Sequence, residues 1–231
     1  VGKPIGYCEK AANIGQGALG VTEHGSCASH FAFHQAGEAT DTKIIYGNEF
    51  YFAADRTLRG LTDEEKNGLT ATEVRDANKA RLRKAHLLLL AETDEGLHNI
   101  YRLNYHANNS GFYGKATIDL PLLRQYSEGI IATTTCVISP MARMLQNKKI
   151  DDMSVWFEDM LGIFGKDRFF IELHPHALDI QREYNQVLIE VFRKKYDVKC
   201  LVQNDVHYVE QDHHEIHNFL WRLNTDGKFD E

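Results

Sequence analysis

The stretch FFIELHPHALDIQREYNQVLIEVFRKKYDVKCLVQNDVH, residues 169–207, contains the pattern that decides the fold. Its start belongs to an apolar run over residues 168–173, which has the length and residue types of a buried strand. Residues 179–196 then repeat apolar side chains at intervals of three and four, the spacing of an amphipathic helix, and residues 199–203 form a second apolar run. A strand, a helix and a strand in this order are typical of parallel strands joined by a crossover helix.

The same alternation extends to both sides of this stretch. Residues 54–79 interrupt it with many charges, so we expect a surface excursion that carries one or two short helices. Because there is neither an internal repeat nor a linker, residues 1–231 are predicted to form a single α/β domain, either a barrel or an open doubly wound sheet. Further strands are predicted at residues 18–22, 43–52, 87–91 and 129–135, and further helices at residues 29–36, 95–105, 155–164 and 212–223.

The composition is that of a globular protein. Of 231 residues, 43% are hydrophobic and 26% are charged, and no apolar run approaches the roughly 20 residues of a membrane helix. The net charge of −7 disfavours a protein that binds nucleic acid through an overall positive charge. It is compatible with a metal site that acts on a phosphate group. Four cysteines without a CxxC pair are typical of a reducing cytoplasm, and twelve histidines hint at metal or proton chemistry. The sequence has no phosphate-binding loop, Rossmann glycine motif or serine-hydrolase elbow.

Side chains that can bind metal or transfer protons follow several of the predicted strands. In a parallel α/β barrel the carboxyl ends of the strands meet at one mouth, so we expect these side chains to converge there. Asp205 and His207 are two residues apart, a spacing that turns an oxygen ligand and a nitrogen ligand to the same side of an extended segment. The residues that we expect to share the mouth are His24, Glu49, Cys136, Asp205 and His207.

Each of these residues also has an ordinary structural interpretation when it is taken alone. Glu49 can be a solvated or helix-capping carboxylate, Cys136 a small buried hydrophobe, and His24 a helix cap. The HHxxH pattern at residues 213–217 is interpreted as a solvated helix face. Taken jointly, the strand-end residues favour a multi-metal hydrolytic centre. Their mixture of imidazole, carboxylate and thiol donors suits Zn²⁺, Mn²⁺ or Fe²⁺ better than Mg²⁺.

Several segments resemble the motifs of one protein family, the PHP (polymerase and histidinol phosphatase) domain. The form that they resemble most is the PHP domain at the amino terminus of the alpha subunit of bacterial replicative DNA polymerase III. The resemblance covers nearly the whole chain apart from the excursion at residues 54–79. The matching segments, in the family's order, are VTEHG (21–25), GNE (47–49), KAHLLLLAETDEGLHNIYRL (84–103), GIIATTTC (129–136), FFIELHPH (169–176), QNDVHYVE (203–210) and RLNTDGKFDE (222–231).

The resemblance implies a fold and a set of site residues. The fold would be a seven-stranded βα barrel of distorted TIM type, with up to three divalent metal ions at its mouth. Glu49 would bridge two metals, whereas His86, which begins rather than ends its apolar run, enters the ligand set through the resemblance alone. His176 matches the histidine of the family's E-L-x-x-H motif and is expected to be catalytic. The residues that match metal-ligand positions are His24, Glu49, His86, Cys136, Asp205 and His207.

Two departures from the family pattern bear on the site. The family's first strand carries an H-x-H motif that would lie upstream of Val1, so we expect the first strand and its three ligands to be missing from the given sequence. Glu23 stands where the family has aspartate. Only the metal held by Glu49, His86 and Cys136 would keep all of its protein ligands, so we expect at most one well-held metal in this chain.

The function that the resemblance implies is metal-dependent phosphoester hydrolysis, above all by a 3′–5′ exonuclease that proofreads DNA during replication. The expected partners are a DNA primer end and the remainder of a DNA polymerase or other replication subunits, with no membrane. Two alternatives stay open. One is a catalytically degenerate docking module of a replicative polymerase, and the other is a stand-alone phosphatase such as histidinol phosphatase.

Overall fold

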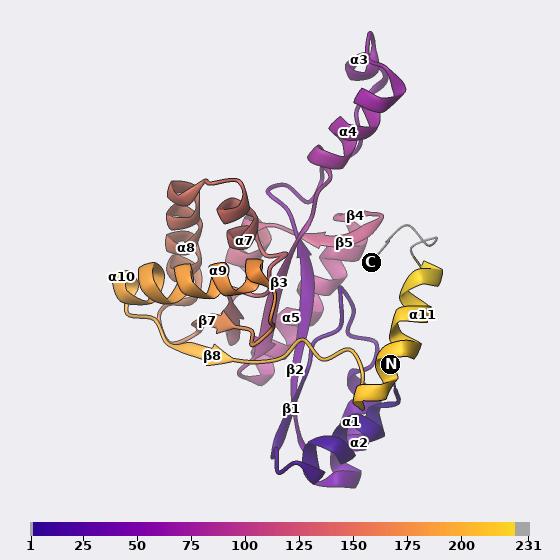
Figure 1. Ribbon diagram of the computed structural model, residues 1–231, viewed down its shortest axis with the longest axis vertical. Coiled ribbons are helices and arrows are strands. Elements are labelled where there is room, and N and C mark those ends of the chain that lie inside the picture. The colour runs from indigo at the N-terminus through magenta and orange to yellow at the C-terminus, as the bar shows by residue number, and fades with distance from the viewer. Residues whose placement is uncertain (1, 225–231) are drawn as a thin grey trace. The chain divides into compact units, whose positions relative to one another are not determined.

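The structure, a computed structural model (Figure 1), describes residues 2–224. These residues divide into two compact units. The larger unit contains residues 22–27 and 46–203, and the smaller unit contains the described parts of residues 1–21, 28–45 and 204–231. Residues 225–231, which belong to the RLNTDGKFDE segment, lie outside the described residues. Within residues 2–224, no helix is both long enough and apolar enough to cross a membrane.

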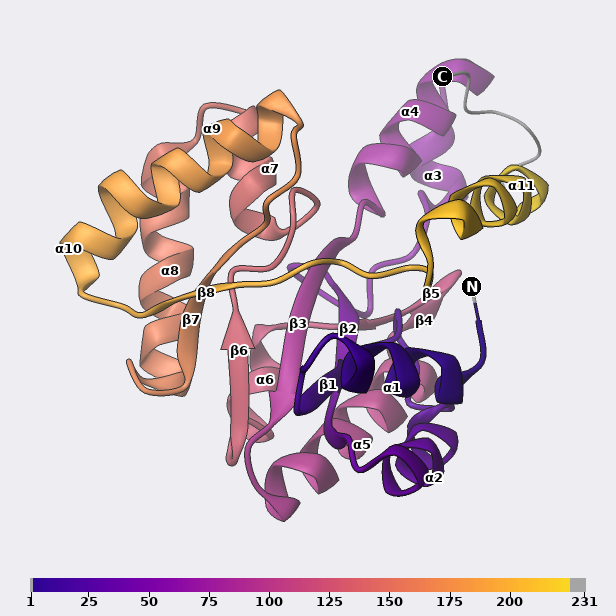
Figure 2. The same cartoon turned by 60° about the horizontal axis from the view of Figure 1, so that its bottom comes forward.

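The larger unit is built on a curled, mixed sheet (Figure 2). Among the described residues its strands follow the order β4-β5-β2-β3-β6-β7-β8. The pairs β2–β5, β6–β7 and β7–β8 are parallel, whereas β3 is antiparallel to both β2 and β6. The strands are β2 (Lys43–Phe52), β3 (Ala85–Ala91), β4 (Phe112–Tyr113), β5 (Lys115–Ile118), β6 (Ile130–Thr133), β7 (Phe169–Leu173) and β8 (Cys200–Val202).

The predicted α/β class is confirmed, and the seven strands form a half-barrel of the distorted TIM-like type. The expectation that all strands are parallel is wrong for β3. A parallel neighbour of β2 would need a crossover connection that returns the chain to the opposite end of the sheet. The segment between β2 and β3 instead projects away from the sheet (Figure 1), so the chain re-enters the sheet at the end where it left.

Helices pack against this sheet and complete one hydrophobic core. The AHLLLLA sequence of β3 buries Leu87 and Leu89, and the amphipathic helix α5 adds Ile100 and Leu103 to the same core. Thr93 begins α5, because its hydroxyl accepts a hydrogen bond from the Gly96 amide over 3.1 Å. The helices are α5 (Asp94–Asn109), α6 (Leu120–Gln125), α7 (Pro140–Gln146), α8 (Ile150–Phe164), α9 (Asp179–Val187), a π-helix (Leu188–Arg193) and α10 (Lys194–Tyr196).

The charged excursion contains two helices, α3 (Asp63–Lys66) and α4 (Ala71–Arg81), as predicted. Both begin with a capping box, in which a threonine hydroxyl and a glutamate carboxylate satisfy backbone amides of the first turn. Neither helix has a buried residue. The two helices are therefore held by local capping and side-chain pairs rather than by a core of their own.

The smaller unit brings together the two ends of the described chain. The Tyr7 hydroxyl donates to the carbonyl of His207 over 3.1 Å, and the Lys10 ammonium lies 2.8 Å from the Glu210 carboxylate. β1 pairs with β2, whose first residues, 43–45, belong to the same unit. The elements are α1 (Pro4–Asn13), β1 (Ala18–Val21), α2 (His30–Thr40), a 3₁₀ turn (Gln211–His213) and α11 (His214–Asn224).

Candidate metal centre

Glu49 is the central residue of the candidate metal centre, and it lies on β2 with only 6% of its surface exposed. The segment after β1 forms a parallel bridge with β2, because the Gly25 amide donates to the Glu49 carbonyl and the Glu49 amide donates to the Glu23 carbonyl. This pairing sets His24 beside Glu49, with 2.8 Å between Nε2 and Oε2. The backbone therefore fixes the first imidazole against the carboxylate.

His86 approaches the same carboxylate from β3. In the antiparallel register His86 is opposite Tyr51, and Glu49 is opposite Leu88. Glu49 and Tyr51 share one face of β2, so His86 lies on that face as a diagonal neighbour of Glu49. Its Nδ1 is 3.1 Å from Oε1 of Glu49.

Antiparallel pairing explains why His86 does not end its strand. The argument from strand ends assumes parallel strands, but an antiparallel strand begins at the edge where its neighbours end. His86 is the second residue of β3, and it therefore reaches the same edge as Glu49. The family resemblance was the only signal in the sequence that included it.

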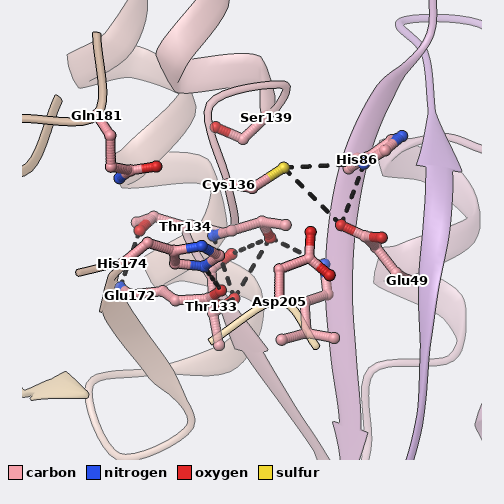
Figure 3. A network of polar contacts seen from close by, with 12 residues as sticks. Glu49, His86, Thr133, Thr134, Cys136, Ser139, Glu172, His174, Gln181 and Asp205 are labelled. Carbon is pink, nitrogen blue, oxygen red and sulfur yellow. Dashed lines mark hydrogen bonds and ion pairs between the residues drawn. The ribbon is translucent and has the colours of Figure 1, made fainter. Parts of the chain in front are cut away.

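Cys136 follows β6 and completes this group (Figure 3). It is buried, and its Sγ lies 3.9 Å from Oε1 of Glu49 and 3.8 Å from Nδ1 of His86. The preceding residue, Thr135, has a φ of 57°, a left-handed conformation that is rare for a β-branched residue. Its hydroxyl accepts a 2.9 Å hydrogen bond from the Leu88 amide of β3. A strained turn that is tied to β3 thus holds the thiol next to His86 and Glu49.

The electrostatics of the group favour an ionised Glu49. Burial raises the pKa of this carboxyl, but hydrogen bonds and charge interactions with His24 and His86 outweigh that effect and lower the pKa to about 2. Arg143 on α7 adds positive charge near the thiol. Burial and the nearby Arg83 lower the pKa of Arg143 to about 10, so its guanidinium stays charged at neutral pH.

The donor set fits a divalent metal ion. Among the described residues, ligand atoms of His24, Glu49 and His86 form the one group of three or more such side chains that lie within 4.8 Å of one another. Two imidazoles, an ionised carboxylate and an adjacent thiol are donors that first-row metals such as Zn²⁺ accept. The site thus matches the chemistry of a metal centre through the side chains of four different segments.

His176 is exposed and lies beyond the end of β7, with its ring centroid 5.3 Å from that of His174. His174 is buried, and its Nε2 lies 2.5 Å from Oε1 of Glu172. The other carboxylate oxygen of Glu172 accepts a hydrogen bond from the Thr133 hydroxyl (Figure 3). The catalytic role of His176 stays a prediction, whereas the buried Glu172 network was not predicted, although an acidic residue inside the apolar run FFIEL signals it.

Asp205 and His207 belong to the smaller unit, where they approach each other as their spacing predicts, with 3.2 Å between Oδ1 and Nε2. The His217 ring of α11 lies 5.2 Å from the His207 ring. Burial and the neighbouring His207 lower the pKa of His217. The convergence of Asp205 and His207 with the other predicted ligands on one pocket stays a prediction.

Comparison with known proteins places these residues in a family. The model of the PHP domain matches residues 2–176. DNA polymerase III subunit alpha of Aquifex aeolicus is 31% identical over 215 residues, which cover 93% of this chain and 18% of that protein. The corresponding subunits of Thermus aquaticus and Saccharopolyspora erythraea are 31% and 32% identical and cover 93% and 91% of this chain. The chain spans 16–18% of the length of these relatives.

A solved structure from Bifidobacterium adolescentis, provisionally described as a metal-dependent phosphoesterase, aligns with 96% of this chain and 91% of its own. Its TM-score of 0.47 and identity of 12% are too low to carry over fold or function. The family match and the sequence identities are sufficient without it. The chain belongs to the PHP domain family.

Proposed function

We propose that this chain is a metal-dependent phosphoesterase domain that removes nucleotides from a DNA 3′ end during replication. The observation that carries the proposal is the buried, ionised Glu49 held between the imidazoles of His24 and His86, with Cys136 beside them. The relatives are alpha subunits of DNA polymerase III, which supports a DNA substrate and a partnership with other replication proteins.

Each residue of the site has a distinct part in the proposed reaction. Glu49, His86 and Cys136 would hold the one metal that this chain is expected to hold well, for which Zn²⁺, Mn²⁺ and Fe²⁺ are the candidates. In a complete site, Glu49 and His24 would also serve a second ion. When bound, such ions activate water and neutralise charge on the phosphate. His24 has 37% of its side chain exposed, so a substrate can approach this group of residues from the side of the imidazole.

Two further predicted residues complete the proposal. In a complete site, Asp205 and His207 would supply an oxygen and a nitrogen donor to a further ion, which is supported by their mutual approach. His176 is exposed and would contact the phosphate or hold a proton for the leaving oxygen.

The test is the shortening of a 5′-labelled DNA primer with a mismatched 3′ end, after the chain has been loaded with Zn²⁺ or Mn²⁺. We expect Glu49→Gln to lower the rate about a hundredfold, because several kcal/mol of transition-state stabilisation depend on the metal. The matched control is Glu64→Gln on the exposed helix α3, which should keep the parent rate. A chain that binds metal through Glu49 but leaves the primer intact would contradict the proposal and favour a structural docking module.

A further inference from the structure

The hairpin formed by β4 and β5 exposes two aromatic side chains at the edge of the sheet. Phe112 is 53% exposed and Tyr113 is 45% exposed, although large apolar side chains are usually covered. Gly114, with a φ of 71°, makes the tight turn between the two strands, and Lys115 follows it at the surface. β4 is the terminal strand of the order β4-β5-β2, so the two rings stand on an edge of the sheet.

Positive side chains surround these rings. The Arg59 guanidinium lies over the Tyr113 ring, 5.7 Å from its centroid, and the Lys84 ammonium donates to the carbonyls of Tyr113 and Lys115. The Lys115 ammonium lies over the Tyr51 ring at 4.8 Å. Within residues 2–224, none of these three cations forms an ion pair with a carboxylate. Arg59 also interacts electrostatically with the Asp55 carboxylate, but without an ion pair. Three positive charges without an ion-paired carboxylate, in a chain of net charge −7, form a local anion site.

This surface is continuous with the candidate metal centre through Tyr51. The Tyr51 ring lies 5.4 Å from the His86 ring and 6.2 Å from the His24 ring. Lys115 and two of the predicted metal ligands therefore lie next to the same aromatic ring. A polyanion held by Lys115 would have its next phosphate close to the metal centre.

We propose that Phe112, Tyr113, Arg59, Lys84 and Lys115 hold the single-stranded end of a polynucleotide, with bases stacked on the two rings and phosphates on the three cations. Aromatic faces that alternate with cations are the arrangement that binds single strands without regard to sequence. A phosphomonoester would use the cations but not the rings, so the surface selects polymers. This inference rests on the proposed phosphoesterase function, for which it identifies the surface that binds the end of the polynucleotide.

The test measures binding rather than cleavage. Fluorescence anisotropy of a labelled oligothymidine is followed with the 231-residue chain in EDTA, which prevents metal-dependent hydrolysis. For three phosphate contacts we expect log Kd to rise with log salt concentration with a slope of about 2. Lys115→Gln should weaken binding several-fold and reduce this slope by about 0.7. Tyr113→Ser should weaken binding about tenfold without changing the slope.

Matched controls are Lys166→Gln, in an exposed turn, and Tyr105→Ser, whose ring is 62% exposed on α5. Both should bind as the parent does, and unchanged urea midpoints establish that all variants are folded. A duplex of the same length should bind more weakly, because its paired bases cannot stack on the rings. The inference is overturned if Lys115→Gln and Tyr113→Ser bind like the controls, or if the duplex binds equally well.

The two proposals fail in different ways. A chain that shows this binding but never shortens a primer contradicts the phosphoesterase function alone. A chain that shortens primers but binds oligothymidine independently of Lys115 and Tyr113 contradicts only the polynucleotide surface.

Discussion

Two buried carboxylates of the larger unit, Glu49 and Glu172, have similar burial and different surroundings. Glu172 is 1% exposed, and its partners His174 and Thr133 are buried as well. Glu49 is 6% exposed, but its partner His24 has 37% of its side chain in contact with solvent. Glu172 thus lies in a closed network, whereas Glu49 lies in a network with an open side.

The difference separates a structural role from a ligand-binding one. In a closed network every polar group depends on its partners, because no water can replace them. In an open network water or a metal ion can take a partner's place. Glu172 is therefore expected to contribute mainly to stability, and Glu49 mainly to binding.

The largest expected effect is on stability, from Glu172→Ala. This change removes an acceptor from the buried His174 ring and from the buried Thr133 hydroxyl, and should lower the free energy of unfolding by about 3–5 kcal/mol. Glu49→Ala in EDTA should cost less than half of that, because His24 keeps its contact with water. Urea unfolding of both variants measures the difference, with the exposed Glu183→Ala as control. Equal losses of unfolding free energy in Glu49→Ala and Glu172→Ala would show that the two carboxylates contribute equally to stability.

For stabilisation by a bound metal, the change at Glu49 should have a larger effect than the change at Glu172. A metal supplied at about a hundred times its Kd should stabilise the parent chain by about 2.7 kcal/mol, and EDTA should reverse this. Glu49→Gln should lose this stabilisation by the metal. Glu172→Gln should keep it, although its free energy of unfolding without metal is lower than that of the parent. The measurement is the urea midpoint with and without Zn²⁺. Retention of the increment by Glu49→Gln would show that the metal binds elsewhere.

The smallest expected effect is that of His24→Gln on the metal-free chain. Because His24 is 37% exposed, its pair with Glu49 is screened by solvent and should contribute about 0–1 kcal/mol to stability. The same variant should nevertheless weaken metal binding, which competition with a chromophoric chelator measures. A loss of stability as large as that of Glu172→Ala would show that the Glu49 network is closed after all.

The sequence predicted most of the strands and the α/β class, because apolar runs and helical spacing are local features. It did not predict α1, whose first residue follows Lys3 without a side-chain cap. Nor did it predict the β4–β5 hairpin, because strands as short as Phe112–Tyr113 leave no alternating pattern.

Local sequence patterns predict some residues of the candidate site but not those whose place depends on strand pairing. His24, Glu49 and Cys136 follow or lie within strands that sequence periodicity identifies, and the structure brings them together. The place of His86 depends on strand direction, which a single strand's sequence does not encode. The Glu172 network depends on Thr133 of a neighbouring strand, a contact between residues that are distant in the sequence.

The antiparallel pairing of β2 with β3 also has a consequence for chain entropy. Six residue pairs, from Gly47 with Leu90 to Phe52 with Ala85, fix the distance between Glu49 and His86, and the α3–α4 segment only closes the loop between them. The free-energy cost of closing a flexible loop grows with the logarithm of its length, about 0.6 kcal/mol for each doubling. The tip of this segment can therefore be lengthened or shortened at little cost, while the two side chains at its root keep their spacing.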